Sequence, residues 1–158
     1  MKKQATSVYL LRGDKLLFLV RNKPNDTVHK QGMYLPAGGK VEPGERVEDC
    51  AIREVAEEAG VLINKLHFVG IHYIRQLDDS HDDWINFMYT SDDFSGEPQA
   101  GNEGHFEWVG WDDLEDKQMY AGDRLYLQFF RDYSFHVAEF TYDGFDFVDV
   151  QLLHTTKK

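Results

Sequence analysis

Residues 36–61 read PAGGKVEPGERVEDCAIREVAEEAGV. The Glu42-Pro43-Gly44 turn is followed by good helix formers, which predict a helix over 45–59. Gly60 suits the end of this helix because glycine readily takes the left-handed conformation found just past a helix C-terminus. Apolar residues recur at helical spacing and predict one side that packs on a core, namely Val47, Ala51, Val55 and Ala59.

The second half of this helix carries three carboxylates on one side. Glu54, Glu57 and Glu58 fall within an arc of about 100°, since each helical residue turns the chain by about 100°. Spacings of three and four residues bring like charges together, and the negative end of the helix dipole is unfavourable for the last two. A Glu-rich face that only contacts water is the common alternative. A bound divalent cation would reverse each unfavourable interaction, and clustered carboxylates suit Mg²⁺ or Mn²⁺.

The residues before the helix indicate a ligand-binding loop. Gly38 and Gly39 permit close approach of the backbone to a bound group, and the ammonium group of Lys40 is suited to meet a phosphate. A Gly-Gly pair by itself usually marks only a turn. Its position beside the acidic helix favours a role in binding an anionic substrate.

The order of these residues resembles the Nudix box, the signature of the Nudix hydrolase family. Gly39 is followed by five residues, Glu45, seven residues and then REVAEEAGV at 53–61, so every fixed position of the box is filled. The resemblance implies the Nudix fold, a mixed β-sheet between helices. It also implies hydrolysis of a nucleoside diphosphate linked to another group.

The same resemblance implies roles for individual residues of the box. It assigns metal binding to Glu57, to Glu58 and to the backbone carbonyl of Gly38. Glu54 is a further metal ligand or the general base, and Arg53 holds it in position. By this resemblance the reaction needs a divalent cation, which also explains how an acidic protein binds an anion.

Family members often supply another carboxylate from a loop outside the box. Residues Gly101-Asn102-Glu103-Gly104 resemble that loop. Glu103 is therefore the candidate for a catalytic or metal-binding role. An exposed loop acid without a function is the alternative.

The rest of the chain alternates β-rich runs with polar turns. Strands are predicted over 7–11, 15–20, 66–75, 84–89, 105–111, 135–141 and 145–150, a short second helix over 123–131, and long loops over 22–33 and 91–104. Mostly antiparallel strands with two helices predict an α+β fold or an α/β/α sandwich. Because no repeat or linker interrupts the chain, one domain is expected over 1–158.

Composition narrows the class of protein. Of the 158 residues, 42% are hydrophobic and 14% aromatic, which predicts a compact core and argues against intrinsic disorder. The three tryptophans, Trp84, Trp108 and Trp111, are expected in that core. A net charge of −11 argues against a nucleic-acid polymer as partner. The single Cys50 and the lack of an apolar run of about 18 residues predict a cytoplasmic protein without a membrane partner. A homodimer stays open.

The C-terminal third resembles the branch of the family that hydrolyses oxidised purine nucleotides. The matching stretch is MYAGD at 119–123, and the resemblance implies that Tyr120 stacks on the base and that Asp123 accepts its ring N–H groups. Two positions depart from that branch, because Gly122 replaces a second Asp and Leu35 replaces an Asn that reads the purine edge. Core packing is the alternative role for Tyr120, and a helix N-cap for Asp123.

The expected reaction is Mg²⁺-dependent hydrolysis of a nucleoside triphosphate. A purine nucleotide like 8-oxo-dGTP is the leading substrate, with a nucleoside monophosphate and pyrophosphate as products. Dinucleotide polyphosphates and ADP-ribose are alternative substrates for the same kind of site. A module that senses nucleotides without hydrolysing them is the alternative from another class.

Overall fold

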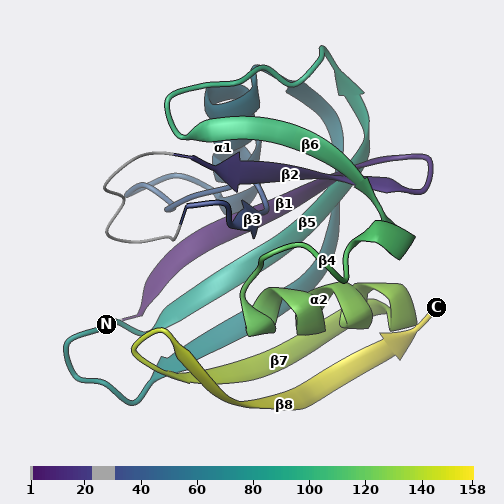
Figure 1. Cartoon of the computed structure of the whole chain (residues 1–158). Coiled ribbons are helices and arrows are strands. Elements are labelled where there is room, and N and C mark those ends of the chain that lie inside the picture. The colour runs from purple at the N-terminus through teal and green to yellow at the C-terminus, as the bar shows by residue number, and fades with distance from the viewer. Residues whose placement is uncertain (1, 23–30) are drawn as a thin grey trace.

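The structure, a computed structural model, describes residues 2–22 and 31–158, and most of the loop predicted over 22–33 lies outside them (Figure 1). The helices are α1 (Val47–Ala59) and α2 (Ala121–Asp132), with a 3₁₀ turn at Trp111–Asp113. The strands are β1 (Lys3–Arg12), β2 (Lys15–Arg21), β3 (Tyr34–Leu35), β4 (Leu62–Gln76), β5 (Trp84–Ser95), β6 (Gly104–Gly110), β7 (Tyr133–Asp143) and β8 (Asp146–Lys157).

The strands form a mixed sheet, as predicted. Their order is β3-β2-β1-β5-β4-β7-β8, and β6 pairs with β2 beside this path. The β1–β5 and β4–β7 pairs are parallel, and the other pairs are antiparallel. β1 pairs with β2 only near their shared turn, at Leu11↔Leu16 and Arg12↔Lys15. The small group of β2, β3 and β6 therefore diverges from the main sheet.

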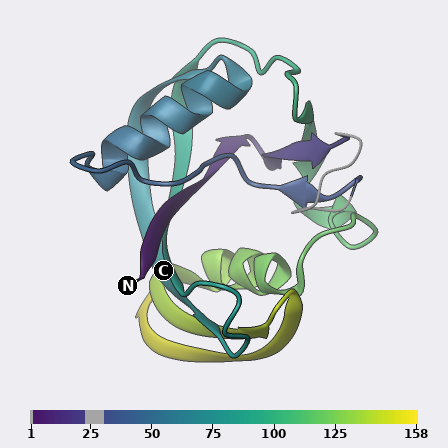
Figure 2. The same cartoon turned by 90° about the vertical axis from the view of Figure 1, so that its left-hand side faces the viewer.

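The two helices cover opposite faces of this sheet, which confirms the predicted α/β/α arrangement. Along β1, Val8 and Leu10 pack in the core shared with α1, whereas Tyr9 packs in the core shared with α2. This alternation arises because successive side chains of a strand point to opposite faces. In the turned view, α1 lies outside the curve of the sheet and α2 lies within it (Figure 2).

α1 is held against the sheet by small side chains. Its inner positions Cys50, Ala51, Val55 and Ala59 are at most 1% exposed. Gly60 ends the helix with φ of 70°, and its N–H donates to the carbonyl of Ala56, as predicted for a glycine at this position. The acidic side of the helix is thereby fixed relative to β1. Neither of the helices described here is long and apolar enough to cross a membrane.

Both helices begin at positions other than those predicted. α1 begins at Val47 and not at 45, because the Glu45 N–H bonds to the carbonyl of Glu42 and completes the preceding turn. α2 begins at Ala121, two residues before the predicted start, with Tyr120 at the N-cap position. Asp123 therefore lies in the first turn of α2, and the interpretation of this residue as an N-cap is wrong.

β5 and β8 extend furthest beyond their predicted C-terminal ends, because a partner strand continues beside each of them. β5 runs to Ser95, into the loop predicted over 91–104, and Ser95 pairs with Leu62 of β4. β8 continues past 150 to Lys157, which pairs with Tyr133 of β7. Most of β8 is exposed, so its sequence lacks the alternation that marks a half-buried strand.

Candidate functional site

The glycine loop lies along the edge of β1. The N–H of Thr6 donates to the carbonyl of Gly39 at 2.9 Å, and the N–H of Val8 donates to the carbonyl of Ala37 at 2.7 Å. Gly38 has φ of 137°, and a Cβ there would collide with the Thr6 carbonyl oxygen. The glycine pair is thus required for close packing of the loop on β1, beyond the needs of an ordinary turn.

Gly39 also faces the acidic helix. A Cβ at this position would lie 2.5 Å from the carboxyl carbon of Glu54 and 2.7 Å from both its oxygens. The loop and the first of the three acids therefore meet without space for a methyl group. Gly39 of the loop and Glu54 of the helix, which are fifteen residues apart in the sequence, are therefore adjacent in the structure.

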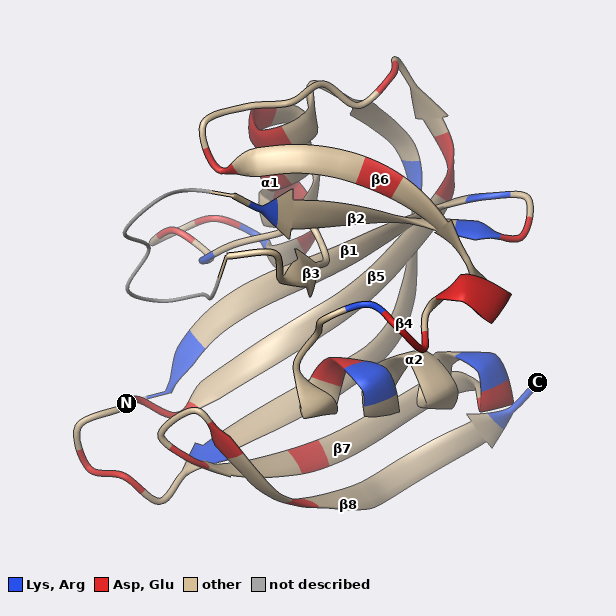
Figure 3. Cartoon of the chain, viewed as in Figure 1, with Lys and Arg blue, Asp and Glu red and all other residues tan. Residues whose placement is uncertain are grey.

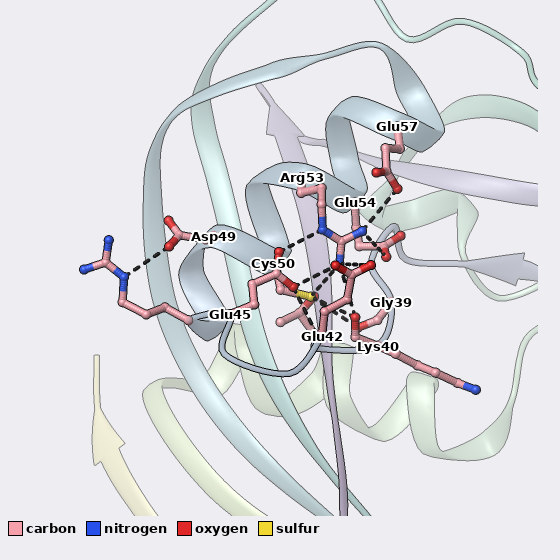
Figure 4. Close-up of polar contacts among 11 residues, drawn as sticks. Gly39, Lys40, Glu42, Glu45, Asp49, Cys50, Arg53, Glu54 and Glu57 are labelled. Carbon is pink, nitrogen blue, oxygen red and sulfur yellow. Dashed lines mark hydrogen bonds and ion pairs between the residues drawn. The ribbon is translucent and has the colours of Figure 1, made fainter.

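Arg53 organises the acids at the start of the site (Figure 4). Its Nε donates to Glu45 at 2.8 Å, and its Nη1 donates to Glu54 at 2.9 Å and to Glu57 at 3.2 Å. The hydrogen bond from Arg53 lowers the pKa of Glu45 to about 2. Part of the like-charge repulsion expected on this helix is thus offset by the guanidinium group. The Glu57 side chain is 60% exposed and turned toward Arg53.

Glu58 lies in a different environment from its neighbours. It is half-buried, its pKa is raised to about 8 by burial first and then by the charges of Glu54 and Glu103, and it shares a hydrogen bond with Glu54. The N–H of Gly38 donates to Glu58 Oε1 at 3.4 Å. Within residues 2–22 and 31–158, Arg53 forms no ion pair with Glu58. A carboxyl group that is crowded by other acids and has no ion pair within the described part of the chain is the strongest signal at this corner.

Glu103 comes to the same corner from the loop before β6. Its carboxylate lies 3.3 Å from the guanidinium of Arg21, and its charge contributes to the raised pKa of Glu58. The N–H of Gly101 donates to the carbonyl of Gly104 at 3.1 Å and closes the turn that presents it. The structure therefore brings Glu103 near Glu58 of the box, and its catalytic or metal-binding role stays a prediction.

These residues fit a divalent cation. The groups that converge are the carboxyl groups of Glu54, Glu58 and Glu103, whose oxygens are the hard donors that Mg²⁺ and Mn²⁺ prefer. In the part of the chain that the structure describes, no three His, Cys, Asp or Glu side chains are already arranged as a metal cage. The fit rests on the Glu54–Glu58 pair and on the crowding of the Glu58 carboxyl group beside the Gly38 loop.

A cavity of about 630 Å³ opens on the other face of β1. Its lining includes Ala5 and Ser7 of β1, Tyr120 at the N-cap position of α2, and Asp123 in the first turn of α2. Burial raises the pKa of Asp123 to about 7. Tyr120 is half-buried and lines this cavity, as a base-stacking role requires.

The cavity also contains residues that sequence reasoning missed. Trp84, expected in the core, lines the cavity, whereas Trp108 and Trp111 pack against the two cores as expected. Asn86 lies two residues along β5 on the same face as Trp84. Because successive side chains of a strand alternate between its two faces, the sequence predicts that Trp84 and Asn86 share one face of β5. Which face meets the cavity depends on the pairing of β5 with β1 and β4.

Lys40 links the loop to this cavity. Its backbone bridges to Ala5, and its Nζ lies 5.7 Å from the centre of the Trp84 ring. Figure 4 shows its side chain directed away from the acids of α1. Lys40 is thus placed at the rim of the cavity, between the loop and the aromatic wall.

Leu35 and Gly122, the two positions that differ from the branch hydrolysing oxidised purine nucleotides, have different surroundings. Leu35 is 8% exposed in β3, outside the cavity lining. A Cβ at Gly122 would collide with the hydroxyl of Tyr142, so this position cannot carry an aspartate without movement of the Tyr142 side chain. Asp123 is the acid that remains on this turn of α2.

Comparison with known proteins gives relatives across most of the chain. Residues 1–130 match the model of the NUDIX domain family. Identity is 31% over 129 residues to YvcI of Bacillus subtilis (strain 168), an uncharacterized Nudix hydrolase, covering 80% of this chain and 77% of that one. Identity is 30% over 122 residues to the oxidized purine nucleoside triphosphate hydrolase of Danio rerio, covering 74% of each chain. A solved mutator MutT protein from Bacillus halodurans has a TM-score of 0.83 at 24% identity, covering 96% of this chain and 97% of that one, which shows the fold alone.

Proposed function

The chain belongs to the NUDIX domain family, and on this premise we propose that it hydrolyses a purine nucleoside triphosphate to a nucleoside monophosphate and pyrophosphate. Hydrolases of this family act on pyrophosphate bonds of nucleotide-type substrates and use divalent metal ions. Our proposal places an 8-oxo-dGTP-like guanine nucleotide first among the purines. The Danio rerio relative, named as an oxidized purine nucleoside triphosphate hydrolase, supports this substrate class.

One observation carries the proposal: the acidic corner and the cavity lie on the two faces of β1 and are joined by a single loop. Thr6 contacts Cys50 of α1 at 3.5 Å, whereas Ala5 and Ser7 on either side of it line the cavity. The glycine loop runs along the edge between the two faces, and Lys40 extends from it to the cavity rim. A nucleotide with its base in the cavity would present its phosphates at this loop.

The proposed metal site consists of Gly38, Glu54, Glu57, Glu58 and Glu103, with Mg²⁺ as the first candidate and Mn²⁺ as the second. When bound, such an ion would neutralise the pyrophosphate and lower the pKa of a water molecule. Arg53 positions Glu54 through the hydrogen bond of 2.9 Å. We assign the role of general base, which takes the proton of the attacking water, to Glu54 or Glu103, the two acids whose charges act on Glu58.

On the cavity side, Tyr120 is proposed to stack on the base, Asp123 to accept base N–H groups, and Lys40 to pair with a phosphate. β7 and β8 continue the same sheet beyond residue 130, which supports one working domain over 1–158. The proposed partner is a small nucleotide, with no nucleic-acid polymer. A homodimer and a cytoplasmic location stay predictions.

A nucleotide panel tests this function. The protein is assayed with Mg²⁺, with Mn²⁺ and with EDTA against dGTP, 8-oxo-dGTP, dATP, a pyrimidine triphosphate, diadenosine polyphosphate and ADP-ribose. Purine triphosphates should give the highest kcat/KM, and chromatography should identify monophosphate and pyrophosphate as products. Preference for ADP-ribose or diadenosine polyphosphate would overturn the substrate assignment. Nucleotide binding without any product would favour a sensing module.

A further inference from the structure

We propose that Asn86 is a specificity-determining residue that hydrogen-bonds the six-position of a purine base while Asp123 accepts the neighbouring ring N–H. This inference rests on the proposed function, because it places a nucleotide base in the cavity beside β5. It assigns the site a chemical preference for 6-oxopurines over 6-aminopurines. Asn86 stands outside the box and outside the MYAGD stretch.

Asn86 lines the cavity from β5, the strand that lies between β1 and β4. In the sheet register it pairs with Ala5 of β1 on one side and with His72 of β4 on the other, and all three line the cavity. Ala5 has no polar side-chain atom. The Nε2 atom of His72 already bonds to His136 at 2.7 Å. The side chain of Asn86 therefore lines the cavity. Neither of the residues that pair with it on the neighbouring strands, Ala5 and His72, offers its carboxamide a hydrogen bond.

Three other polar side chains of the lining are already engaged. Gln76 bonds to both backbone groups of Gly144, at 2.9 Å and 3.0 Å. Asp82 pairs with Lys3 at 2.7 Å, and Ser80 bonds to Asp78.

Asn86 and Asp123 differ from these residues. Neither side chain hydrogen-bonds to any residue of the ranges 2–22 and 31–158. Half-buried polar groups left unpaired cost free energy unless a ligand satisfies them.

The chemistry of the two groups selects one kind of base. A 6-oxopurine presents a ring N–H donor next to a carbonyl acceptor, and a 6-aminopurine presents the reverse order. A carboxylate only accepts, whereas a carboxamide also donates through its NH₂ group. Asp123 with Asn86 thus forms an acceptor and a donor that complement the 6-oxopurine edge. The aromatic side chains of Trp84 and Tyr120 line the same cavity and supply surfaces for the faces of the ring.

Matched nucleotides test this assignment. dITP and dATP differ only at the purine edge in question, so their kcat/KM ratio isolates it. The assays are run at about pH 8.5, where Asp123, with its pKa of about 7, is mainly a carboxylate. The variants are Asn86→Leu, which removes the amide at similar volume, and Asn86→Asp, which keeps the shape and replaces the donor. Gln128→Glu, on the exposed side of α2, is the control for the added charge.

The expected result is a selective loss. Asn86→Leu should lower kcat/KM for dITP about 10-fold and change that for dATP less than about 2-fold. Asn86→Asp should shift the dITP/dATP ratio toward dATP by about 10-fold or more, while Gln128→Glu leaves it unchanged. Equal losses for both nucleotides, or an unchanged ratio in both Asn86 variants, would overturn the assignment.

A binding measurement separates this inference from the proposed reaction. Calorimetry with dIMP and dAMP gives Kd values without any turnover, and Asn86→Asp should shift the dIMP/dAMP preference in the same direction. If no nucleotide is hydrolysed, the proposed reaction fails, and the Kd ratio still decides the role of Asn86. A changed dIMP/dAMP ratio, with the melting temperature equal to that of the unsubstituted protein, supports recognition of the base by Asn86. A lower melting temperature with equal losses of affinity for both nucleotides indicates a structural role and overturns the assignment.

Discussion

Replacing Gly39 by alanine should slow hydrolysis about 100-fold while the protein stays folded. The added Cβ would lie 2.5 Å from the Glu54 carboxyl carbon, and ordinary contact begins at 3.4 Å, so Glu54 must retreat by about 0.9 Å. A misplacement of about 1 Å in a catalytic group costs about 100-fold in rate, or about 2.7 kcal/mol of activation free energy. Gly39 has no left-handed φ, so alanine itself fits the backbone.

The assay is steady-state pyrophosphate release with Mg²⁺, together with thermal unfolding. We expect kcat to fall with little change in KM, and the free energy of unfolding to change by less than about 1 kcal/mol, because alanine also restricts the unfolded chain. Gly110→Ala is the control, since its Cβ would meet only an Asp113 oxygen at 3.3 Å and its φ is −70°. A folded Gly39→Ala protein with kcat within about 3-fold of the original would refute the assigned position of Glu54.

Three further substitutions test the site and its surroundings. Burial raises the Asp123 pKa from 3.8 to about 7, so the stability tied to its protonated form is complete below pH 3.8 and is lost as pH rises through about 7. Asp123→Asn should remove this fall in the free energy of unfolding, which amounts to about 1.4 kcal/mol for each unit of pKa shift. Denaturant titrations in which the variant and the unsubstituted protein show the same pH dependence of stability would contradict this. Gly122→Ala should destabilise the protein by about 1–3 kcal/mol through the Tyr142 hydroxyl, and the cost should vanish in a Tyr142→Phe background; a double-mutant cycle without coupling would exclude that contact. Arg53→Lys keeps the charge but loses the planar fork that holds Glu54, so kcat should drop at least about 10-fold with Mg²⁺ present, and an unchanged kcat would remove the positioning role.

The acidic corner could be predicted from the sequence because its parts are local. The helix, its glycine end and the spacing of its acids all lie within residues 36–61, and the structure places them as a unit. Helical geometry alone brings Glu54 and Glu58 to one side. The sequence did not reveal that Arg53 turns Glu57 outward, because that orientation depends on which acids compete for one guanidinium group.

The cavity could be predicted only in part because it depends on strand pairing. Tyr120 and Asp123 were found through a local stretch, whereas Trp84 and Asn86 face the cavity only because β5 lies between β1 and β4 in one register. A shift of one residue would turn both side chains to the other face. The extended ends of β5 and β8 have the same origin, since each continues where a neighbour supplies backbone partners.

The parallel pairing of β1 with β5 governs how this protein must be assembled during synthesis. Lys3 pairs with Trp84 and Leu10 with Ser91, so the first strand leaves the ribosome long before its main neighbour exists. Non-local pairing of this kind slows folding and leaves a strand edge exposed in the meantime. A nascent chain cut short before β5 would therefore contain every residue of the acidic helix, of the glycine loop and of β1, and still lack the strand that pairs with β1 from Lys3 to Leu10.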